Sequence, residues 1–177
     1  MSVSSRERVE TERLICERLR LDHAPELTRL LGDPRVARTM FADGLPLAEP
    51  AVSDGIRDKI EHWERHGFGP WLLRDRATGE MVGRGGLQHT FVAGSDEVEV
   101  GWAIIPDRWG QGLATELAHA SVALAFDDLG LAQIVAFTLP DNVASRRVME
   151  KAGFVYEREI VHAGLDHVLY RRVAESP

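Results

Sequence analysis

Apolar and polar residues alternate along several short segments of the chain, and this alternation predicts β-strands. Residues 97–100 read Glu-Val-Glu-Val, which is typical of a strand with one buried face. Residues 70–91 are rich in apolar residues on both sides of the turn sequence RATGE, so they predict a β-hairpin. Further strands are predicted over residues 13–21, 132–139, 154–161 and 168–173.

Other segments repeat their apolar residues at helical spacing. Between Val52 and Trp63 the apolar positions are four, four and three residues apart, which predicts an amphipathic helix over residues 51–66. The strand–helix–strand order of residues 97–139 and the mixture of elements as a whole predict an α/β or α+β fold. Helices are also predicted after Asp22 and over residues 34–40, 112–129 and 142–152.

Length and charge limit the class of protein. A chain of 177 residues has the length of one domain, which we expect to span residues 12–175, with the polar residues 1–11 disordered. The chain has 21 Lys and Arg against 28 Asp and Glu, a net charge of −7, which argues against nucleic acid as a partner because phosphates need a basic face. No membrane span or signal-peptide core is evident, and Cys16 is the single cysteine, so we expect a cytoplasmic protein.

The segment WGQGLAT, residues 109–115, places two glycines immediately before a predicted helix. A helix N-terminus exposes unpaired N–H groups and about half a positive charge, and glycines let an anion approach the backbone closely. The segment contains no lysine, so it suits a pyrophosphate held by the backbone. The alternative is a loop whose glycines only turn the chain. The P-loop motif is absent, and Thr115 stands where a dinucleotide fingerprint needs its third glycine.

Two longer motifs carry a resemblance to a known family. EVGWAIIPDRWGQGLATE, residues 99–116, and PDNVASRRVMEKAGF, residues 140–154, together resemble the GNAT superfamily of acyl-CoA-dependent N-acetyltransferases, in particular its ribosomal-protein N-terminal acetyltransferase branch. The resemblance extends over almost the whole chain. It implies a central, mixed but mostly antiparallel sheet flanked by helices, whose fourth and fifth strands run parallel and splay apart. It also implies acetyl-CoA as the acetyl donor and no metal.

The resemblance assigns residues to the cofactor. The pyrophosphate would rest on the helix that begins near Gly112, and the family signature Q/R-x-x-G-x-G/A matches Trp109, Gly112 and Ala114, with Trp109 departing from Gln or Arg. Backbone groups just after Gly101 would pair with the pantetheine, and Asn142 matches an asparagine that contacts the cofactor near its thiol. The implied cofactor-binding residues are Trp102, Ala103, Ile104, Trp109, Gly110, Gln111, Gly112, Leu113, Ala114, Thr115, Asn142 and Ser145.

Acetyl transfer requires a neutral amine, a donor for the carbonyl oxygen and a proton for the leaving thiolate. Glu97 and Glu99 lie on one strand face, and either could accept the amine's proton; Glu99 matches a common position of the family's base. The alternatives are a solvated strand face and ordered water as the base. Met149 stands where many members have a tyrosine acid, so the resemblance implies Ser145 instead, unless this serine only bonds to backbone. By the same resemblance, the Trp102 N–H would hold the carbonyl oxygen.

The resemblance therefore predicts an N-acetyltransferase that moves an acetyl group from acetyl-CoA directly to a primary amine in a ternary complex. The acceptor stays open between a protein N-terminus and a small-molecule amine. Two alternatives are a non-catalytic acyl-CoA-binding regulator of the same fold and a dinucleotide-dependent enzyme. A homodimer is compatible with the family, whose members often dimerise.

Three aromatic residues and a histidine pair have simpler interpretations. His62 and His66 are one helical turn apart, but Trp63 stands where the zinc-protease motif needs Glu, so we expect no metal there. Trp63, Phe68 and Trp71 could line an acceptor groove, but we expect them in the core.

Overall fold

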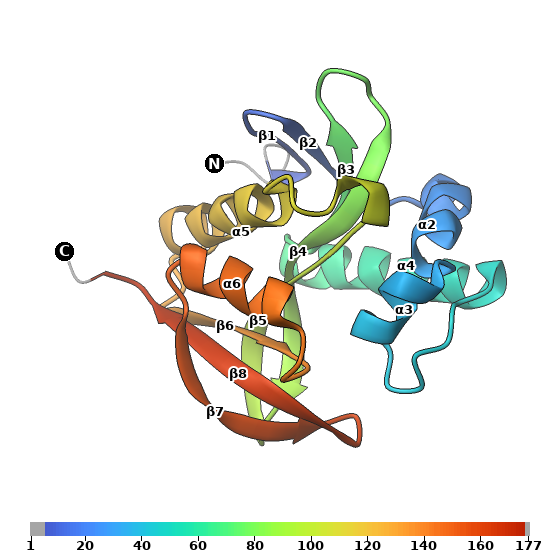
Figure 1. The fold of residues 1–177 in the computed structure, drawn as a ribbon. Coiled ribbons are helices and arrows are strands. Elements are labelled where there is room, and N and C mark those ends of the chain that lie inside the picture. Colours follow the sequence, from blue (N-terminus) through green and yellow to red (C-terminus); the bar gives the residue numbers. More distant parts are fainter. Residues whose placement is uncertain (1–5, 176–177) are drawn as a thin grey trace.

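The computed structural model describes residues 6–175, which form an eight-stranded sheet in the order β1-β2-β3-β4-β5-β6-β8-β7 (Figure 1). In this part of the chain β5 and β6 are the one parallel pair, and all other neighbouring strands are antiparallel. This mixed, mostly antiparallel sheet confirms the predicted fold class. The strands are β1 (Arg8–Glu10), β2 (Leu14–Arg18), β3 (Pro70–Asp75), β4 (Met81–Val92), β5 (Ser95–Ile104), β6 (Gln133–Thr138), β7 (Val155–His162) and β8 (Leu165–Val173).

Local sequence signals set the ends of the helices. The side chain of Asp33 accepts a hydrogen bond from the backbone N–H of Arg35 and caps α3, and Gly67, at φ 70°, ends α4 in a left-handed conformation. The helix predicted over residues 112–129 is α5 followed by one π-helical turn, Leu124–Asp128. No helix within residues 6–175 is long and apolar enough to cross a membrane. The helices are α2 (Ala24–Leu31), α3 (Pro34–Met40), α4 (Glu49–His66), α5 (Leu113–Ala123) and α6 (Val143–Lys151).

Both faces of the sheet are covered. α5 packs on one face through Leu113, Leu117 and Val122, in the same core cluster as Trp63, Phe68 and Trp71, so the prediction that these three aromatic residues belong to the core is confirmed. The second cluster joins α2, α3 and α4 to the opposite face of β3, β4 and β5. Figure 1 shows α5 and α6 side by side, apart from the group of α2, α3 and α4.

The N-terminal segment is more ordered than the sequence indicates. Within the segment 1–11 that we expected to be disordered, Arg8–Glu10 forms β1 and pairs with β2. The indole N–H of Trp71 also donates to the Arg6 carbonyl at 2.8 Å. Backbone pairing orders this polar segment, and polar composition carries no signal of such pairing. Residues 1–5 lie outside the described residues.

The sheet divides between β5 and β6. Their single paired position is Glu99 opposite Val135, whereas β5 stays paired to β4 up to Ile104 opposite Gly83. The side of β5 that faces β6 therefore lacks a strand partner from Gly101 onwards. This is the splayed geometry that the resemblance implied for the fourth and fifth strands, which are β5 and β6 because β1 adds one strand at the N-terminal end.

Three histidines gather beside this sheet, at the end of α4 and on β4. The His62 and His66 rings have centroids 4.5 Å apart, and those of His66 and His89 are 4.1 Å apart. His62 is neutral here: its Nδ1 lies 2.9 Å from the Phe68 carbonyl and its Nε2 accepts the His89 backbone N–H at 2.9 Å. Burial, followed by the neighbouring His66, lowers the pKa of His62 to about 4.

We predict opposite effects for two Gly→Ala substitutions. A Cβ at Gly85 would lie 2.5 Å from both the Gly101 carbonyl oxygen and Leu117 Cδ2, so Gly85→Ala forces β4 and α5 apart. It should lower the free energy of unfolding by about 1–3 kcal/mol. Gly55, inside α4, has nothing within 4 Å of such a Cβ, so Gly55→Ala should raise it by about 0.5–1 kcal/mol. Urea melts measure both; equal effects would contradict the close packing at Gly85.

We also predict that His62 makes the fold sensitive to acid. The unfolded imidazole takes up its proton near pH 6.5, whereas the folded one does so only near pH 4. Its contribution is therefore complete above pH 6.5 and is lost as the pH falls towards 4. Because the ring is partly exposed to solvent, we expect a loss of about 1–2 kcal/mol.

The comparison that tests this prediction is the variant His62→Gln, whose amide can keep both hydrogen bonds without titrating. Urea melts between pH 6.5 and pH 4.5 should show a smaller loss of stability in this variant than in the wild type. His119→Gln, which removes an exposed histidine on α5, is the matched control. Identical pH slopes in the wild type and His62→Gln would contradict the role of His62.

Candidate functional site

Two adjoining cavities open where β5 and β6 diverge. The first, of about 340 Å³, lies between the N-terminal ends of α5 and α6, and we call it the helix cavity. The second, of about 320 Å³, is bounded by the end of α3 and the β7–β8 hairpin, and we call it the hairpin cavity. Thr39, Trp102, Asn142 and Ser145 line both, so the two cavities meet at these four residues.

The N-terminus of α5 forms one wall of the helix cavity. Gly112 is its N-cap, at φ 81°, and no side chain caps the helix there. The backbone N–H groups of Leu113, Ala114 and Thr115 therefore lack helical partners, and all three residues line the cavity. A Cβ at Gly112 would be strained at this φ, so glycine is needed to bring the loop onto the helix.

Ion pairs and hydrogen bonds fix this loop. Arg13 Nε lies 2.7 Å from the carboxylate of Glu116, in the first turn of α5, and Arg13 Nη1 donates to the Gln111 carbonyl at 2.7 Å. Since Glu116 is neutralised by Arg13, its charge does not cancel the positive end of the helix. On the other side of the loop, the Trp109 indole N–H donates to the Ile104 carbonyl at 2.7 Å. Trp109 therefore ties the loop to the end of β5.

The first turn of α6 supplies the residues that separate the two cavities. The Asn142 Oδ1 accepts the Ser145 backbone N–H at 3.2 Å, and the Asn142 Nδ2 donates to Thr138 Oγ1 at 3.1 Å. The Ser145 hydroxyl itself makes no hydrogen bond with any residue in 6–175, so the interpretation of a serine that merely bonds to backbone lacks support. This hydroxyl is available to a ligand at the junction.

Two cations on α6 also line the helix cavity, and Lys151 is the one that the sequence analysis missed. Arg147 and Lys151 are four residues apart, which places them on one face of the helix. Arg146 points elsewhere, donating to the Tyr170 hydroxyl at 3.2 Å and the Pro140 carbonyl at 3.0 Å. Helical spacing from Arg147 could have found Lys151. Free N–H groups and two cations fit the phosphates of CoA.

The cavity lining agrees closely with the residues implied for the cofactor. All of them line the helix cavity except Gln111. The Gln111 Oε1 instead accepts from Arg108 Nε at 2.9 Å, so its side chain is engaged outside the cavity. The sequence analysis also missed Val36 and Thr39, which reach the cavity from α3. No sequence pattern links α3 to α5, because only the packing of the two helical groups on the sheet brings them together.

Glu99 is the carboxylate of the hairpin cavity. It lies on β5 at the last position paired with β6, and Gln88 Nε2 donates to its Oε1 at 3.2 Å. Burial raises the pKa of Glu99 above that of an ordinary carboxyl, and the hydrogen bond from Gln88 and the positive charges of Lys59 and Arg84 oppose this shift only in part. A raised carboxyl pKa is typical of a general base.

Glu97 is not brought to the same place. Its two carboxylate oxygens accept from the Arg171 guanidinium at 2.9 and 3.1 Å, and it lines neither cavity. Because Arg171 lies on β8, this ion pair ties β5 to β8 across β6. The structure thus separates the two carboxylates: Glu97 holds the sheet together and Glu99 faces a cavity.

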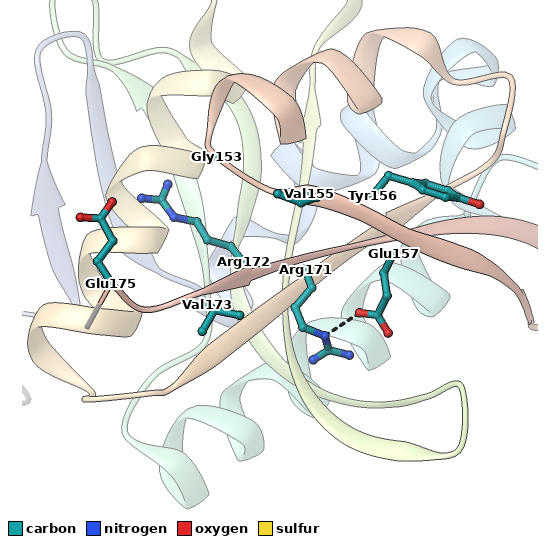
Figure 2. A pocket seen from close by; sticks show the side chains of 8 residues that line it. All are labelled: Gly153, Val155, Tyr156, Glu157, Arg171, Arg172, Val173 and Glu175. Atoms are coloured by element: carbon teal, nitrogen blue, oxygen red, sulfur yellow. Dashed lines mark hydrogen bonds and ion pairs between the residues drawn. The ribbon is translucent and has the colours of Figure 1, made fainter. Parts of the chain in front are cut away.

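A larger, open groove of about 620 Å³ lies on the β7–β8 edge of the sheet. Figure 2 shows Arg171 and Glu157 pointing toward one another there, and their side chains form an ion pair. The groove shares no residue with the helix and hairpin cavities. Within it Arg171 and Glu157 neutralise each other, so we assign the chemistry to the two junction cavities instead.

Comparisons with known proteins agree with this geometry. Residues 13–155 match the family model described as an acetyltransferase (GNAT) domain. The chain is 30% identical over 149 residues to the N-acetyltransferase YoaA of Bacillus subtilis, covering 84% of this chain and 83% of that one. A GnaT-family acetyltransferase structure from Bordetella pertussis superposes with a TM-score of 0.81 at 25% identity, covering 95% of this chain and 100% of that one.

A second similar structure is the ribosomal L7/L12 α-N-protein acetyltransferase RimL in complex with CoA, with a TM-score of 0.76 at 18% identity, covering 94% of this chain and 98% of that one. At this identity the likeness shows that the two chains share a fold. The splayed strands, the glycine-capped helix and the family match lead to one conclusion. The chain belongs to the GNAT acetyltransferase family and is an acetyl-CoA-dependent acyltransferase.

Proposed function

We propose that this enzyme transfers an acetyl group from acetyl-CoA directly to a primary amine, with both substrates bound at once. The observation that carries the proposal is the junction of the helix and hairpin cavities at Trp102, Asn142 and Ser145. A donor in one cavity and an amine in the other would meet there without a covalent enzyme intermediate. The acceptor is a protein N-terminus or a small-molecule amine.

The helix cavity is the proposed donor site. The α5 N–H groups, with Arg147 and Lys151, would hold the phosphates, and the unpaired edge of β5 after Gly101 would pair with the pantetheine amides. When bound, acetyl-CoA supplies an activated acetyl group. The Trp102 backbone N–H is the proposed donor to the carbonyl oxygen on which negative charge develops.

The hairpin cavity supplies the base. Glu99 would take the proton from the attacking amine, directly or through a water molecule, because its raised pKa makes it a better proton acceptor than a surface carboxylate. As the new C–N bond forms and the C–S bond breaks, the Ser145 hydroxyl would donate a hydrogen bond to the departing sulfur and pass on a proton from solvent.

Expectations of a cytoplasmic location and a homodimer stay predictions.

The first test is the release of CoA, followed with a thiol reagent, over short peptides with different N-termini, polyamines, aminoglycosides and amino acids. Isothermal titration with acetyl-CoA accompanies it. Turnover with one class of amine supports the proposal. Tight binding of acetyl-CoA with no turnover on any amine would favour a non-catalytic regulator, and failure to bind acetyl-CoA would contradict the proposed donor site.

We predict that Ser145→Ala lowers kcat about 100-fold, within the range for loss of an acid that protonates a leaving group. The affinity for acetyl-CoA should change little, because the backbone N–H of residue 145 still donates its hydrogen bond to Asn142 Oδ1. Ser53→Ala, which changes a serine on α4 that lines neither cavity, is the control. An unchanged kcat in Ser145→Ala would remove the serine from the mechanism.

We predict different outcomes for the two carboxylates of β5. Glu99→Gln should lower kcat/KM about 100-fold or more at neutral pH, and should abolish the acidic limb of the pH profile that Glu99 produces. Because its pKa is raised, that limb should lie above the pH range of an ordinary glutamate. Glu97→Gln should leave the limb in place while lowering stability, since it breaks the pair with Arg171. The reverse pattern would make Glu97 the base.

A further inference from the structure

The hairpin cavity holds a cation without a partner. Arg84, on β4 opposite Ala103, lines this cavity and a smaller one of about 60 Å³ beside it. Within residues 6–175 its guanidinium forms no hydrogen bond or ion pair, and its Nε is buried without a partner. By contrast, the partly buried Arg74 pairs with two carboxylates. An unpaired, desolvated guanidinium is costly unless a ligand completes it.

A second unsatisfied atom lies in the same cavity. Gln88 donates its Nε2 to Glu99, which leaves its Oε1 buried without a partner. The structure has five such buried side-chain atoms among the described residues, and two of them, Arg84 Nε and Gln88 Oε1, line this cavity. One is a donor and the other an acceptor. A ligand that satisfied both would need an acceptor group at one end and an N–H group at the other.

The charged groups around the hairpin cavity also favour a ligand with a negative group. Lys59, on α4, acts electrostatically on both Arg84 and Glu99, and the Asp58 carboxylate acts on Lys59. Burial lowers the pKa of both Lys59 and Arg84, which indicates that water screens their charges poorly. An ammonium group placed against the Arg84 guanidinium would be repelled. A molecule with its own negative group would be attracted.

The space between the two ends is open. Gly101 lines the hairpin cavity, and Gly101 and its pairing partner Gly86 line the smaller cavity beside it, on the stretch of β4 and β5 between the Gln88–Glu99 pair and Arg84. A Cβ at Gly101 would meet Glu99 Oε1 at 3.3 Å and no other atom within 4 Å. The strands thus leave room over Gly101 for the body of a ligand.

We propose that the acceptor of this enzyme is an amine that also carries an anionic group, a carboxylate or a phosphate, which Arg84 binds while the amine lies against Gln88 and Glu99. The inference rests on the proposed function and narrows its acceptor class. Free amino acids are the simplest molecules with this pattern. The planar guanidinium binds a carboxylate or phosphate through two parallel N–H groups. An amine without an anionic group offers these N–H groups no such pair of acceptors.

The test compares matched acceptors with and without the anion. Alanine, phenylalanine and lysine are each paired with their carboxamides, and O-phosphoethanolamine is paired with ethanolamine. For the wild type we expect kcat/KM about 10- to 100-fold higher for the anionic member of at least one pair, and Arg84→Gln should remove that preference. Arg84→Lys should retain part of it. The matched control, Arg57→Gln on the exposed side of α4, should keep the full preference.

A binding measurement separates this inference from the proposed function. N-acetylphenylalanine and its amide are titrated into the protein saturated with CoA, and the acid should bind about 10- to 100-fold more tightly in the wild type but not in Arg84→Gln. Equal binding and equal turnover of acids and amides, or a preference that survives in Arg84→Gln, would overturn the inference even if amines are acetylated. Failure to bind acetyl-CoA would instead overturn the proposed function. A preference confined to the phosphate pair identifies phosphate as the anion.

Discussion

The separation of β5 from β6 is the constraint on which the rest of the structure depends. A parallel pair in the middle of a sheet normally satisfies its backbone groups along its whole length, yet here pairing is limited to Glu99 and Val135. Unpaired backbone groups are costly unless water or a ligand satisfies them. Because α5 follows β5 and α6 follows β6, both helices begin at the diverging ends, and two helix N-termini meet the unpaired strand edge.

Several interactions around this opening hold the strands and loops that border it in position. The Glu97–Arg171 ion pair connects β5 to β8 at a position just before Glu99 in the chain. The Trp109 indole N–H ties the loop that precedes α5 to Ile104, at the C-terminal end of β5. Gly85 lets α5 pack closely on β4. These contacts lie outside the junction itself, so they fix its walls without occupying it. Glu99 lies where the pairing of β5 with β6 ends: it is the position paired with Val135, and it lines the hairpin cavity.

The sequence predicted the lining of the helix cavity better than that of the hairpin cavity. The residues after Gly101 and around Gly112 are contiguous and follow a family pattern, so their convergence could be predicted, and Gln111 departs only because its side chain is engaged by Arg108. The hairpin cavity is built from segments far apart in the chain. Nothing in the sequence distinguishes Arg84 from other residues in strands. Its lack of an ion-pair partner depends on where the fold places the carboxylates. The pairing of Arg8–Glu10 was missed for the same reason.

The two cavities share only a few of their lining residues, and this division has an evolutionary consequence. The wall specific to the hairpin cavity includes the β7–β8 turn and the segment after α3, both of which lie outside the α5 loop and the helix cavity. Under the proposed function, substitutions or insertions in those segments can therefore alter the amine that is accepted without disturbing the donor site. A lineage with this architecture can acquire new substrates through two surface segments while its central chemistry is inherited unchanged.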